Sequence, residues 1–492
     1  MKITPLILVL FFSLSLTAQN DKAERLTAFI EHTLAATDNL TGLSVAVAGP
    51  DGALYTQGFG YANRTTQVPV TPATSFYIAS CTKAYNGLLS SILAEEGLLD
   101  LERPILEYRP FRSFERQKIF EGITVLDLLT HQSGIENPYL STLLAYSGDY
   151  TDAQILRLIE EETQANETGK AFRYTNFGYY LLDVLLQAEL GKSWRDLLQE
   201  KIFIPLGMMH TTAYASKVST PSEAVPYDGL YPEEISPVYL TKADATMHAA
   251  GGLMTTGEDA ARFLSCYLNP EQGPYPASVV QASYQKQVQG DHEVTDAFNA
   301  DGYALGWRTG SYADQRMAYH FGGYPGFFSS LSFMPDAGLS VVVLANNNIS
   351  GQLAIKITQY AYDLYLGNEQ AVKKHERQAA RQLQKKLKRY RKFEAKHKAK
   401  LAKRSWQLTL PKVAYTGTYR NEHMGKVTVA LEEGNLVALM GQIRTVATPY
   451  PHDNCARVEM APGSGMVICF GVEDGKVKDF SFGRDLFERV ED

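Results

Sequence analysis

The chain has 492 residues and a formal net charge of −7, with 45% hydrophobic and 11% aromatic residues. This length exceeds what one ordinary core supports, so we expect two or three domains, and the composition excludes a disordered chain. Residues 373–404 carry 15 Lys and Arg against Glu376 and Glu394, a net +13, which leaves about −20 for the rest of the chain. An acidic body excludes nucleic acid as the main partner.

Residues 1–19 have the pattern of an export signal. Lys2 is followed by the apolar run Ile7–Leu16 and by the small-residue segment Thr17-Ala18-Gln19. The apolar run is too short for a stable membrane anchor. We therefore expect an exported protein, either periplasmic or secreted.

Residues 20–367 are predicted to form one α/β (α+β) domain. An amphipathic helix, Asp21–Ala36, precedes the strands Leu43–Ala48 and Leu54–Gly60. The chain rejoins this sheet near residue 303. The predicted later elements are the strands Tyr303–Thr309, Phe327–Met334 and Leu339–Ala345 and a closing helix Gln352–Leu366. A long helical insertion lies between, with pieces at Thr124–Leu129, Asp152–Glu162, Tyr179–Leu190, Ser193–Ile202 and Gly257–Leu268.

The last two segments differ from this body. Residues 368–411 predict a basic helical linker, with a narrow apolar stripe that includes Leu383 and Leu387. Two interpretations of residues 373–404 stay open: weak contact with a membrane or another anionic surface, or a solvated helix packed on the body or on a second copy in a homo-oligomer. We favour the packed helix, because the stripe is poor in Trp, Phe and Leu. Residues 412–492 alternate in short strands and predict a small β-barrel or sandwich.

The four cysteines are scattered. Only Cys455 and Cys469 share a small domain and could pair, and two buried thiols are the simpler expectation. No cluster of His, Cys and carboxylate residues has metal-ligand spacing, so we predict no metal and no cofactor.

Ser80 and Lys83 lie three residues apart at the start of a predicted helix that ends at Gly97. Backbone N–H groups there can hold an oxyanion. A lysine buried at this place is pushed toward its neutral form and can take the proton of a serine hydroxyl. The alternative is a helix capped by Ser80 with a solvated Lys83.

Tyr174-x-Asn176 stands just before another predicted helix. Tyr174 could carry a proton to the leaving group, and Asn176 could hold Lys83 or a substrate amide. The alternative is a core tyrosine and an asparagine that caps the helix.

His320-x-Gly322-Gly323 precedes a strand of the sheet. Glycines allow a strand edge to approach a substrate closely, and the Gly323 N–H could join the Ser80 N–H in an oxyanion hole. The alternative is a glycine-rich strand entry with a surface histidine.

The chain resembles the β-lactamase-related serine hydrolases, which are relatives of class C β-lactamases, D-amino-acid peptidases and certain esterases. The resemblance covers about residues 23–366. It implies a penicillin-binding-protein fold with a β-lactamase-like mixed antiparallel sheet, flanking helices and a large helical insertion. It rests on five landmarks in one order: Ser80-x-x-Lys83, Leu128–Gly134, Tyr174-x-Asn176, Gly251–Thr256 and His320-x-Gly322-Gly.

The resemblance also implies roles. Ser80 would be the acylated nucleophile, Lys83 and Tyr174 the general-base pair, and Asn176 a contact of the substrate and of the lysine. The segments 128–134 and 251–256 look structural.

One departure concerns His320. Class C β-lactamases usually carry Lys-Thr-Gly at this third motif, where the lysine meets a substrate carboxylate. His320 would supply a weaker, pH-dependent positive charge, a pattern similar to the aminopeptidase and esterase members of the family.

The leading hypothesis is therefore a secreted, cofactor-free serine hydrolase that cleaves an ester or a peptide, including peptides with D-amino acids. Two alternatives stay open: a β-lactamase or DD-carboxypeptidase acting on β-lactams or cell-wall material, and a non-catalytic cell-envelope binding protein. The substrate depends on loops near residues 135–150 and 215–300, whose shapes the sequence does not give.

Overall fold

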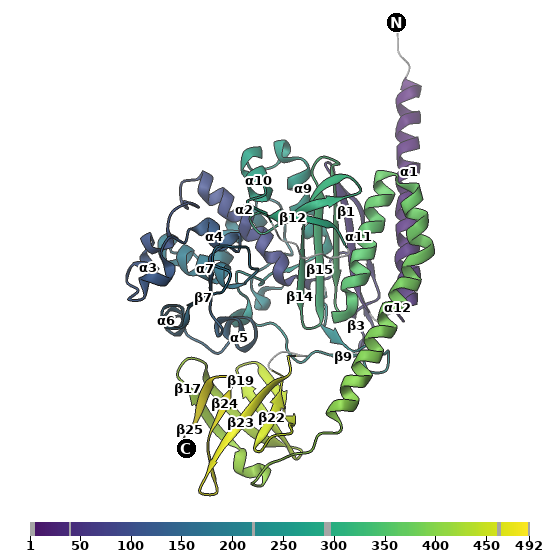
Figure 1. Cartoon of the computed structure of the whole chain (residues 1–492). Coiled ribbons are helices and arrows are strands. Elements are labelled where there is room, and N and C mark those ends of the chain that lie inside the picture. Colours follow the sequence, from purple (N-terminus) through teal and green to yellow (C-terminus); the bar gives the residue numbers. More distant parts are fainter. Residues whose placement is uncertain (1–4, 39–40, 219–221, 290–296, 460–463, 491–492) are drawn as a thin grey trace.

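The computed structural model of the chain describes residues 5–38, 41–218, 222–289, 297–459 and 464–490. Its centre is an antiparallel sheet with the strand order β11-β12-β13-β14-β15-β16-β1-β2 (Figure 1). The N-terminal hairpin thus forms one end of the sheet, where Leu43 of β1 lies opposite Ala345 of β16. The strands are β1 (Leu43–Gly49), β2 (Gly52–Phe59), β11 (Val288–Gln289), β12 (Asn299–Tyr303), β13 (Arg308–Tyr312), β14 (Gln315–Tyr324), β15 (Phe327–Met334) and β16 (Leu339–Ala345).

Two cores lie on the two faces of this sheet. Every residue of β1 and β16 is buried, and successive side chains of a strand point to opposite faces. In β16, Val342 and Leu344 join one core, whereas Val341 and Val343 join the other. The β-branched run of β16 suits a strand that is covered on both sides.

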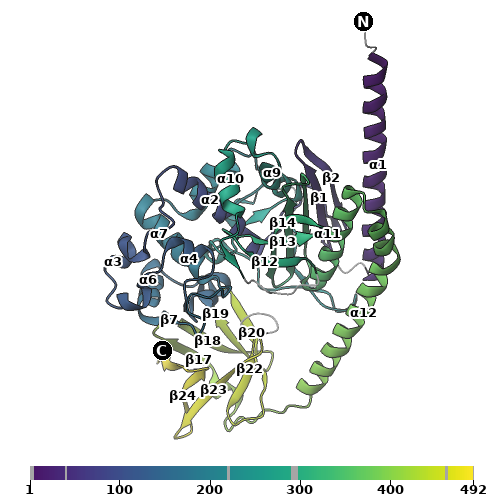
Figure 2. The same ribbon diagram turned by 45° about the horizontal axis from the view of Figure 1, so that its top comes forward.

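Different helices cover the two faces, as Figures 1 and 2 show. On one face pack α1 (Pro5–Ala36), α11 (Gly351–Leu366) and α12 (Glu369–Leu401), with the Phe29 and Tyr360 rings stacked at 3.8 Å. On the other pack α2 (Thr82–Glu95) and α9 (Gly257–Leu268). The predicted helix 21–36 is the C-terminal half of α1. Of the predicted export signal, residues 1–4 lie outside the described part, and its cleavage stays a prediction.

The sequence prediction was wrong between residues 299 and 324. The single expected strand 303–309 is two strands, β12 and β13, which are joined by a tight turn in which Gly306 has a φ of 78°. The expected strand entry at residues 320–323 belongs to a further strand, β14. The turn at Gly306 contains no polar stretch. The local pattern of apolar residues therefore does not reveal where the strand reverses.

The insertion between β2 and β11 forms the second half of the body. Several of its helices start at a side-chain cap, for example the Thr124–Asp127 capping box before α4. The further helices are α3 (Arg109–Arg112), α4 (Val125–Leu129), α5 (Leu140–Thr142), α6 (Asp152–Glu162), α7 (Phe177–Leu190), α8 (Trp194–Leu198) and α10 (Ala277–Tyr284). The short strands are β3 (Tyr61–Asn63), β4 (Val68–Pro69), β5 (Phe76–Tyr77), β6 (Ile135–Glu136), β7 (Gln164–Ala165), β8 (Tyr227–Asp228), β9 (Ser236–Pro237) and β10 (Met254–Thr255).

Beyond α12 the chain forms a nearly closed barrel, with the strand order β20-β19-β18-β17-β25-β24-β23-β22-β21. The barrel touches the insertion, where the Tyr139 hydroxyl donates to Asp485 at 2.6 Å and the Gln442 N–H donates to the Ser147 carbonyl at 2.8 Å. Its strands are β17 (Gly417–Asn421), β18 (Gly425–Glu432), β19 (Asn435–Met440), β20 (Ile443–Val446), β21 (Thr448–Pro449), β22 (Cys455–Val458), β23 (Met466–Glu473), β24 (Lys476–Phe482) and β25 (Asp485–Val490).

The expectation of two buried thiols in the barrel was wrong. Cys455 and Cys469 face each other across β22 and β23 and form a disulfide. Cys81 and Cys266 are buried free thiols. Within the described ranges, none of the helices is both long and apolar enough to span a membrane.

Candidate active site

Ser80 lies in a short 3-10 turn that leads directly into α2. The sequence alone had placed it in the first turn of that helix. The turn is fixed by the β5–β10 pair and by the Ile78 N–H, which donates to the Leu253 carbonyl at 3.0 Å. Ala79 has a φ of 45°, in the left-handed region that side chains disfavour. Ala79 and Cys81 are buried but Ser80 is half-buried, so this turn presents the serine hydroxyl to a cavity.

Lys83 follows in the first turn of α2, and its amine has three polar neighbours. Nζ lies 3.2 Å from Ser80 Oγ, 2.8 Å from Asn176 Oδ1 and 2.7 Å from the Ala250 carbonyl oxygen. The oxygens of Asn176 and Ala250 can only accept, so each takes an N–H bond from Lys83. In the neutral amine the lone pair is then left for the Ser80 hydroxyl proton. These contacts orient Lys83 as a base toward Ser80.

The surroundings favour the neutral amine. Lys83 is fully buried, and this burial holds the pKa of its amine well below the usual value, helped by the nearby Arg308 guanidinium. The rings of Tyr174 and Tyr179, with centroids 4.9 and 5.4 Å from Nζ, cover the amine. The neutral amine of Lys83 is therefore favoured, and it is the form that can act as a base.

Asn176 and Tyr174 lie on the loop that leads into α7. Asn176 stands at the N-cap position but makes no side-chain cap bond, because its oxygen accepts from Lys83. The interpretation of Asn176 as a helix cap is therefore wrong. Tyr174 packs its ring against His131, with the centroids 4.5 Å apart, and lines the same cavity as Ser80. The structure thus brings both residues of this motif to the serine.

The third motif lies on an open strand edge. Among the described strands, residues 320–324 of β14 pair with β15 only, so the other edge faces the Ser80 turn. A Cβ on Gly322 would lie 2.0 Å from the Ile78 carbonyl oxygen, so only glycine permits this approach. A Cβ on Gly323 would meet nothing within 4 Å. A side chain at position 323 would therefore meet no steric barrier.

The expected pH-dependent charge of His320 was wrong. His320 is buried, and this burial lowers the pKa of its imidazole well below the usual value, as does the nearby Arg308 guanidinium. Its Nδ1 lies 2.7 Å from the Phe321 carbonyl oxygen and must donate, while Nε2 lies 3.2 Å from the Tyr303 hydroxyl and accepts. His320 is a neutral, oriented ring.

Arg308, at the start of β13, supplies the permanent positive charge that His320 lacks. Its guanidinium lies 5.5 Å from the Tyr174 ring centroid, and the side chain lines the cavity with Ser80 and His320. Sequence reasoning missed Arg308, because no motif marks it and its place was assigned to the interior of a strand. Sequence reasoning also gave the segment containing His131 only a structural part, whereas His131 contacts Tyr174 and accepts a bond from the Thr175 N–H at 3.3 Å.

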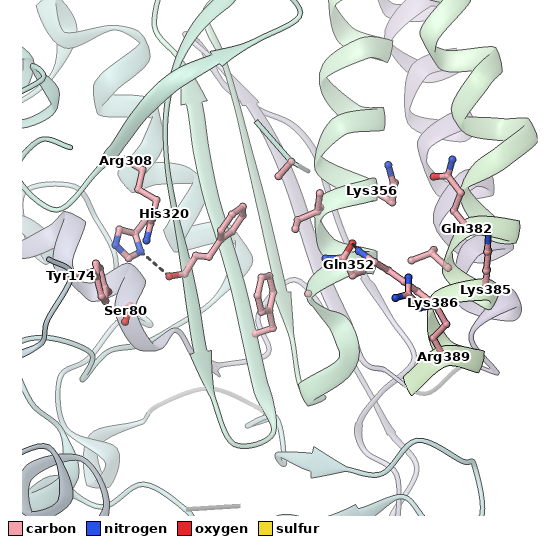
Figure 3. Close-up of a pocket in the computed structure, with 16 residues that line it drawn as sticks. Ser80, Tyr174, Arg308, His320, Gln352, Lys356, Gln382, Lys385, Lys386 and Arg389 are labelled. Carbon is pink, nitrogen blue, oxygen red and sulfur yellow. Dashed lines mark hydrogen bonds between the residues drawn. The ribbon is translucent and has the colours of Figure 1, made fainter. Parts of the chain in front are cut away.

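One cavity of about 890 Å³ joins these groups to a more distant surface. This volume is in the upper range for small-molecule sites. Figure 3 shows its two ends, with Ser80, Tyr174, Arg308 and His320 on one side of the strands and cationic side chains of α11 and α12 on the other. In the described part of the chain, no three or more side chains are grouped as metal ligands.

The Beta-lactamase family model matches residues 26–365. This chain belongs to the beta-lactamase family. The resemblance noted in its five sequence landmarks is confirmed, and the fold is shared with a penicillin-binding protein homologue.

Protein flp of Staphylococcus aureus (strain MW2) is 27% identical over 335 residues, which are 67% of this chain and 64% of that protein. The unguisins hydrolase ungD' of Aspergillus campestris (strain IBT 28561) is 26% identical over 334 residues, 64% of this chain and 60% of that protein. The chain therefore spans less than two thirds of the length of these relatives. The octameric penicillin-binding protein homologue from Pyrococcus abyssi superposes with a TM-score of 0.60 at 22% identity, covering 94% of this chain and 99% of that one. This likeness extends over the fold, the C-terminal barrel included.

Proposed function

We propose that this protein hydrolyses esters or peptides through an acyl-enzyme on Ser80, with Lys83 as the base. The single observation that carries the proposal is the position of Lys83 Nζ, which lies 2.8 and 2.7 Å from two fixed acceptors and 3.2 Å from Ser80 Oγ. In the neutral amine the two acceptors take its N–H groups, and the lone pair is left for the serine proton. Burial favours the neutral form of an amine with this geometry, and the neutral form can take the serine proton during the reaction.

Acylation then proceeds in successive steps. The Ser80 hydroxyl oxygen forms a bond to the substrate carbonyl carbon while its proton passes to Lys83 Nζ. The oxyanion that results is held by the N–H groups of Ser80 and Gly323. When the tetrahedral intermediate collapses, the leaving amine or alkoxide takes a proton through Tyr174, which is reprotonated by the Lys83 ammonium. Water then attacks the acyl carbon and gives a proton to Lys83. The bond from this carbon to Ser80 Oγ breaks, Lys83 returns the proton to Oγ, and the carboxylic acid leaves.

The neutral His320 and the cationic Arg308 support a role in substrate orientation. A substrate whose polar or anionic group lies beside the reactive carbonyl would meet Arg308, while His320 would present an uncharged ring. The name of the relative ungD', a hydrolase, agrees with cleavage chemistry. Peptides with D-amino acids remain within the proposed substrate class.

Export to an oxidising compartment is part of the proposal. It rests on the signal pattern of residues 1–19 and on the disulfide between Cys455 and Cys469, because disulfides persist mainly outside the cytoplasm. Sequencing the N-terminus of the protein recovered from the periplasm or medium tests it, and a mature chain that starts at Met1 would contradict it.

Mass spectrometry after exposure to a fluorophosphonate tests the nucleophile. We expect one adduct on Ser80 and none, under the same conditions, on the Lys83→Ala variant. An adduct on another residue, or equal labelling of the variant, would refute the mechanism. A penicillin lane distinguishes the β-lactam alternative, because lasting labelling or rapid turnover of penicillin would favour a penicillin-binding or β-lactamase role.

A further inference from the structure

The charge along the large cavity is unlike that of the rest of the chain. The chain carries −7 overall, yet every charged side chain among the described residues that line this cavity is a cation, and none is acidic. The lining cations are Arg308, Lys356, Lys385, Lys386 and Arg389. A cleft lined by one sign of charge concentrates ligands of the opposite sign.

The cavity continues away from the serine. Beside His320 on β14, its lining includes the partly exposed rings of Phe321 and Phe328, then Ile355 on α11 and Leu383 on α12. Figure 3 shows the labelled polar groups gathered in two places, around Ser80 and on α11 and α12, and the cavity lining also includes the apolar side chains just named. The cavity therefore has a reactive end, an apolar middle and a cationic end.

The cationic end is held in place. Lys386 on α12 donates to Gln352 on α11, and Leu383 is buried against the body. Elsewhere on α12 the cations serve to attach the helix, since Arg391 pairs with Asp38 and Lys398 pairs with Glu234.

Lys385 and Arg389 differ from these attachment residues. They lie one helical turn apart on an exposed face of α12 and form no ion pair with any described residue. Other lysines of α12, such as Lys388 and Lys392, are exposed too but do not line the cavity. What singles out Lys385 and Arg389 is that they open into the same space as Ser80.

We propose that the cavity takes an elongated, anionic substrate. Its reactive carbonyl lies at Ser80, its apolar middle lies on Phe321 and Phe328, and its carboxylate or phosphate groups lie against Lys385 and Arg389. The inference rests on the proposed function and deepens it, because it names the substrate class. It also gives α12 a role in the active-site cavity, in place of contact with a membrane or another anionic surface.

The test uses the full chain and a set of chromogenic esters that share one reactive carbonyl and one apolar spacer. The spacer ends in a neutral amide, in two carboxylates or in a phosphate monoester, and it is attached through the acyl part in one set and through the leaving group in another. The measured quantity is the selectivity, the ratio of kcat/KM for an anionic to the neutral ester. We expect a clear preference for an anionic tail in at least one set, which decreases at high salt because exposed charges are screened.

Two double variants give the comparison. In Lys385→Glu/Arg389→Glu, the selectivity should fall about tenfold, the effect of reversing two exposed charges. Lys388→Glu/Lys392→Glu makes the same change of net charge at the same spacing outside the cavity, and it should keep the selectivity. The neutralised variant Lys385→Gln/Arg389→Gln should lie between wild type and the reversal.

The outcomes separate the two proposals. If the wild type hydrolyses the neutral ester but shows no preference for either tail, or if both double variants lose the preference equally, the inference is refuted. If Lys385→Glu/Arg389→Glu loses binding to vesicles of anionic phospholipid but keeps its selectivity, the inference is also refuted, in favour of a membrane role for α12. If Ser80 takes no fluorophosphonate and no ester is turned over, the proposed function itself fails. The tail that gives the larger preference distinguishes carboxylate from phosphate.

Discussion

Replacing Gly322 by alanine should separate the third motif from the nucleophile. The added Cβ would lie 2.0 Å from the Ile78 carbonyl oxygen and 2.3 Å from Ser329 Oγ, whereas real Cβ contacts stay beyond 3.0 Å. The strand and the turn before Ser80 must therefore move apart by about 1 Å. A displacement of this size costs on the order of 100-fold in rate, and overpacking of a buried site costs roughly 1–3 kcal/mol of stability.

The assay is the rate of Ser80 labelling by a fluorophosphonate, followed by mass spectrometry, together with the melting temperature. Gly322→Ala should slow labelling by about 100-fold and lower Tm by several degrees, roughly 2–4 °C for each kcal/mol. Gly323→Ala is the matched control for stability, because a Cβ there meets nothing within 4 Å, and its Tm should not change. Wild-type labelling and Tm in Gly322→Ala would refute the view that this glycine sets the distance between β14 and the nucleophile.

Three further changes probe the charges and the barrel. Lys83→Met should lower kcat/KM by about 1,000-fold, as loss of a general base does. Because the folded pKa of Lys83 is lowered, the wild type should gain unfolding free energy as pH rises toward about 10.4, and a urea titration of the variant at several pH values should lack that slope. His320→Gln should keep the shape of the pH profile of kcat/KM, since a neutral His320 does not titrate near pH 6.5. An acid limb at that pH that the variant abolishes would contradict this assignment. Cys455→Ser/Cys469→Ser, which opens a loop with a sequence separation of 14, should cost the barrel about 3 kcal/mol of unfolding free energy in urea, and unchanged unfolding would show that the disulfide is dispensable.

Local spacing and helix starts in the sequence were enough to predict four residues of the candidate site. Ser80, Lys83, Tyr174 and Asn176 were identified because each stands at a spacing, or at a helix start, that makes its side chain useful to a neighbour. The structure brings these four together even though Asn176 is 93 residues from Lys83. The beta-lactamase-like fold followed from the same landmarks, and it is confirmed.

Long-range packing decided what the sequence could not. The charge of His320 depends on burial among Tyr303, Lys83 and Arg308, which come from different strands and helices. Arg308 itself acquires a role only because β13 begins opposite Tyr319, directly before the unpaired edge of β14. Pairing of Cys455 with Cys469 depends on the register of β22 and β23. No local pattern contains these facts.

Burial of the Lys83 amine explains why the site is assembled from distant segments. An amine in a dry environment gains reactivity as a base, but a buried polar group without partners costs stability. The Asn176 oxygen and the Ala250 carbonyl satisfy two of its N–H groups, and they come from the loop before α7 and the segment before β10. Removing the Asn176 oxygen would leave one N–H unsatisfied and free to turn toward Ser80. The lone pair would then no longer be directed at the hydroxyl. The two acceptors that offset the cost of burying the amine therefore also orient it as a base.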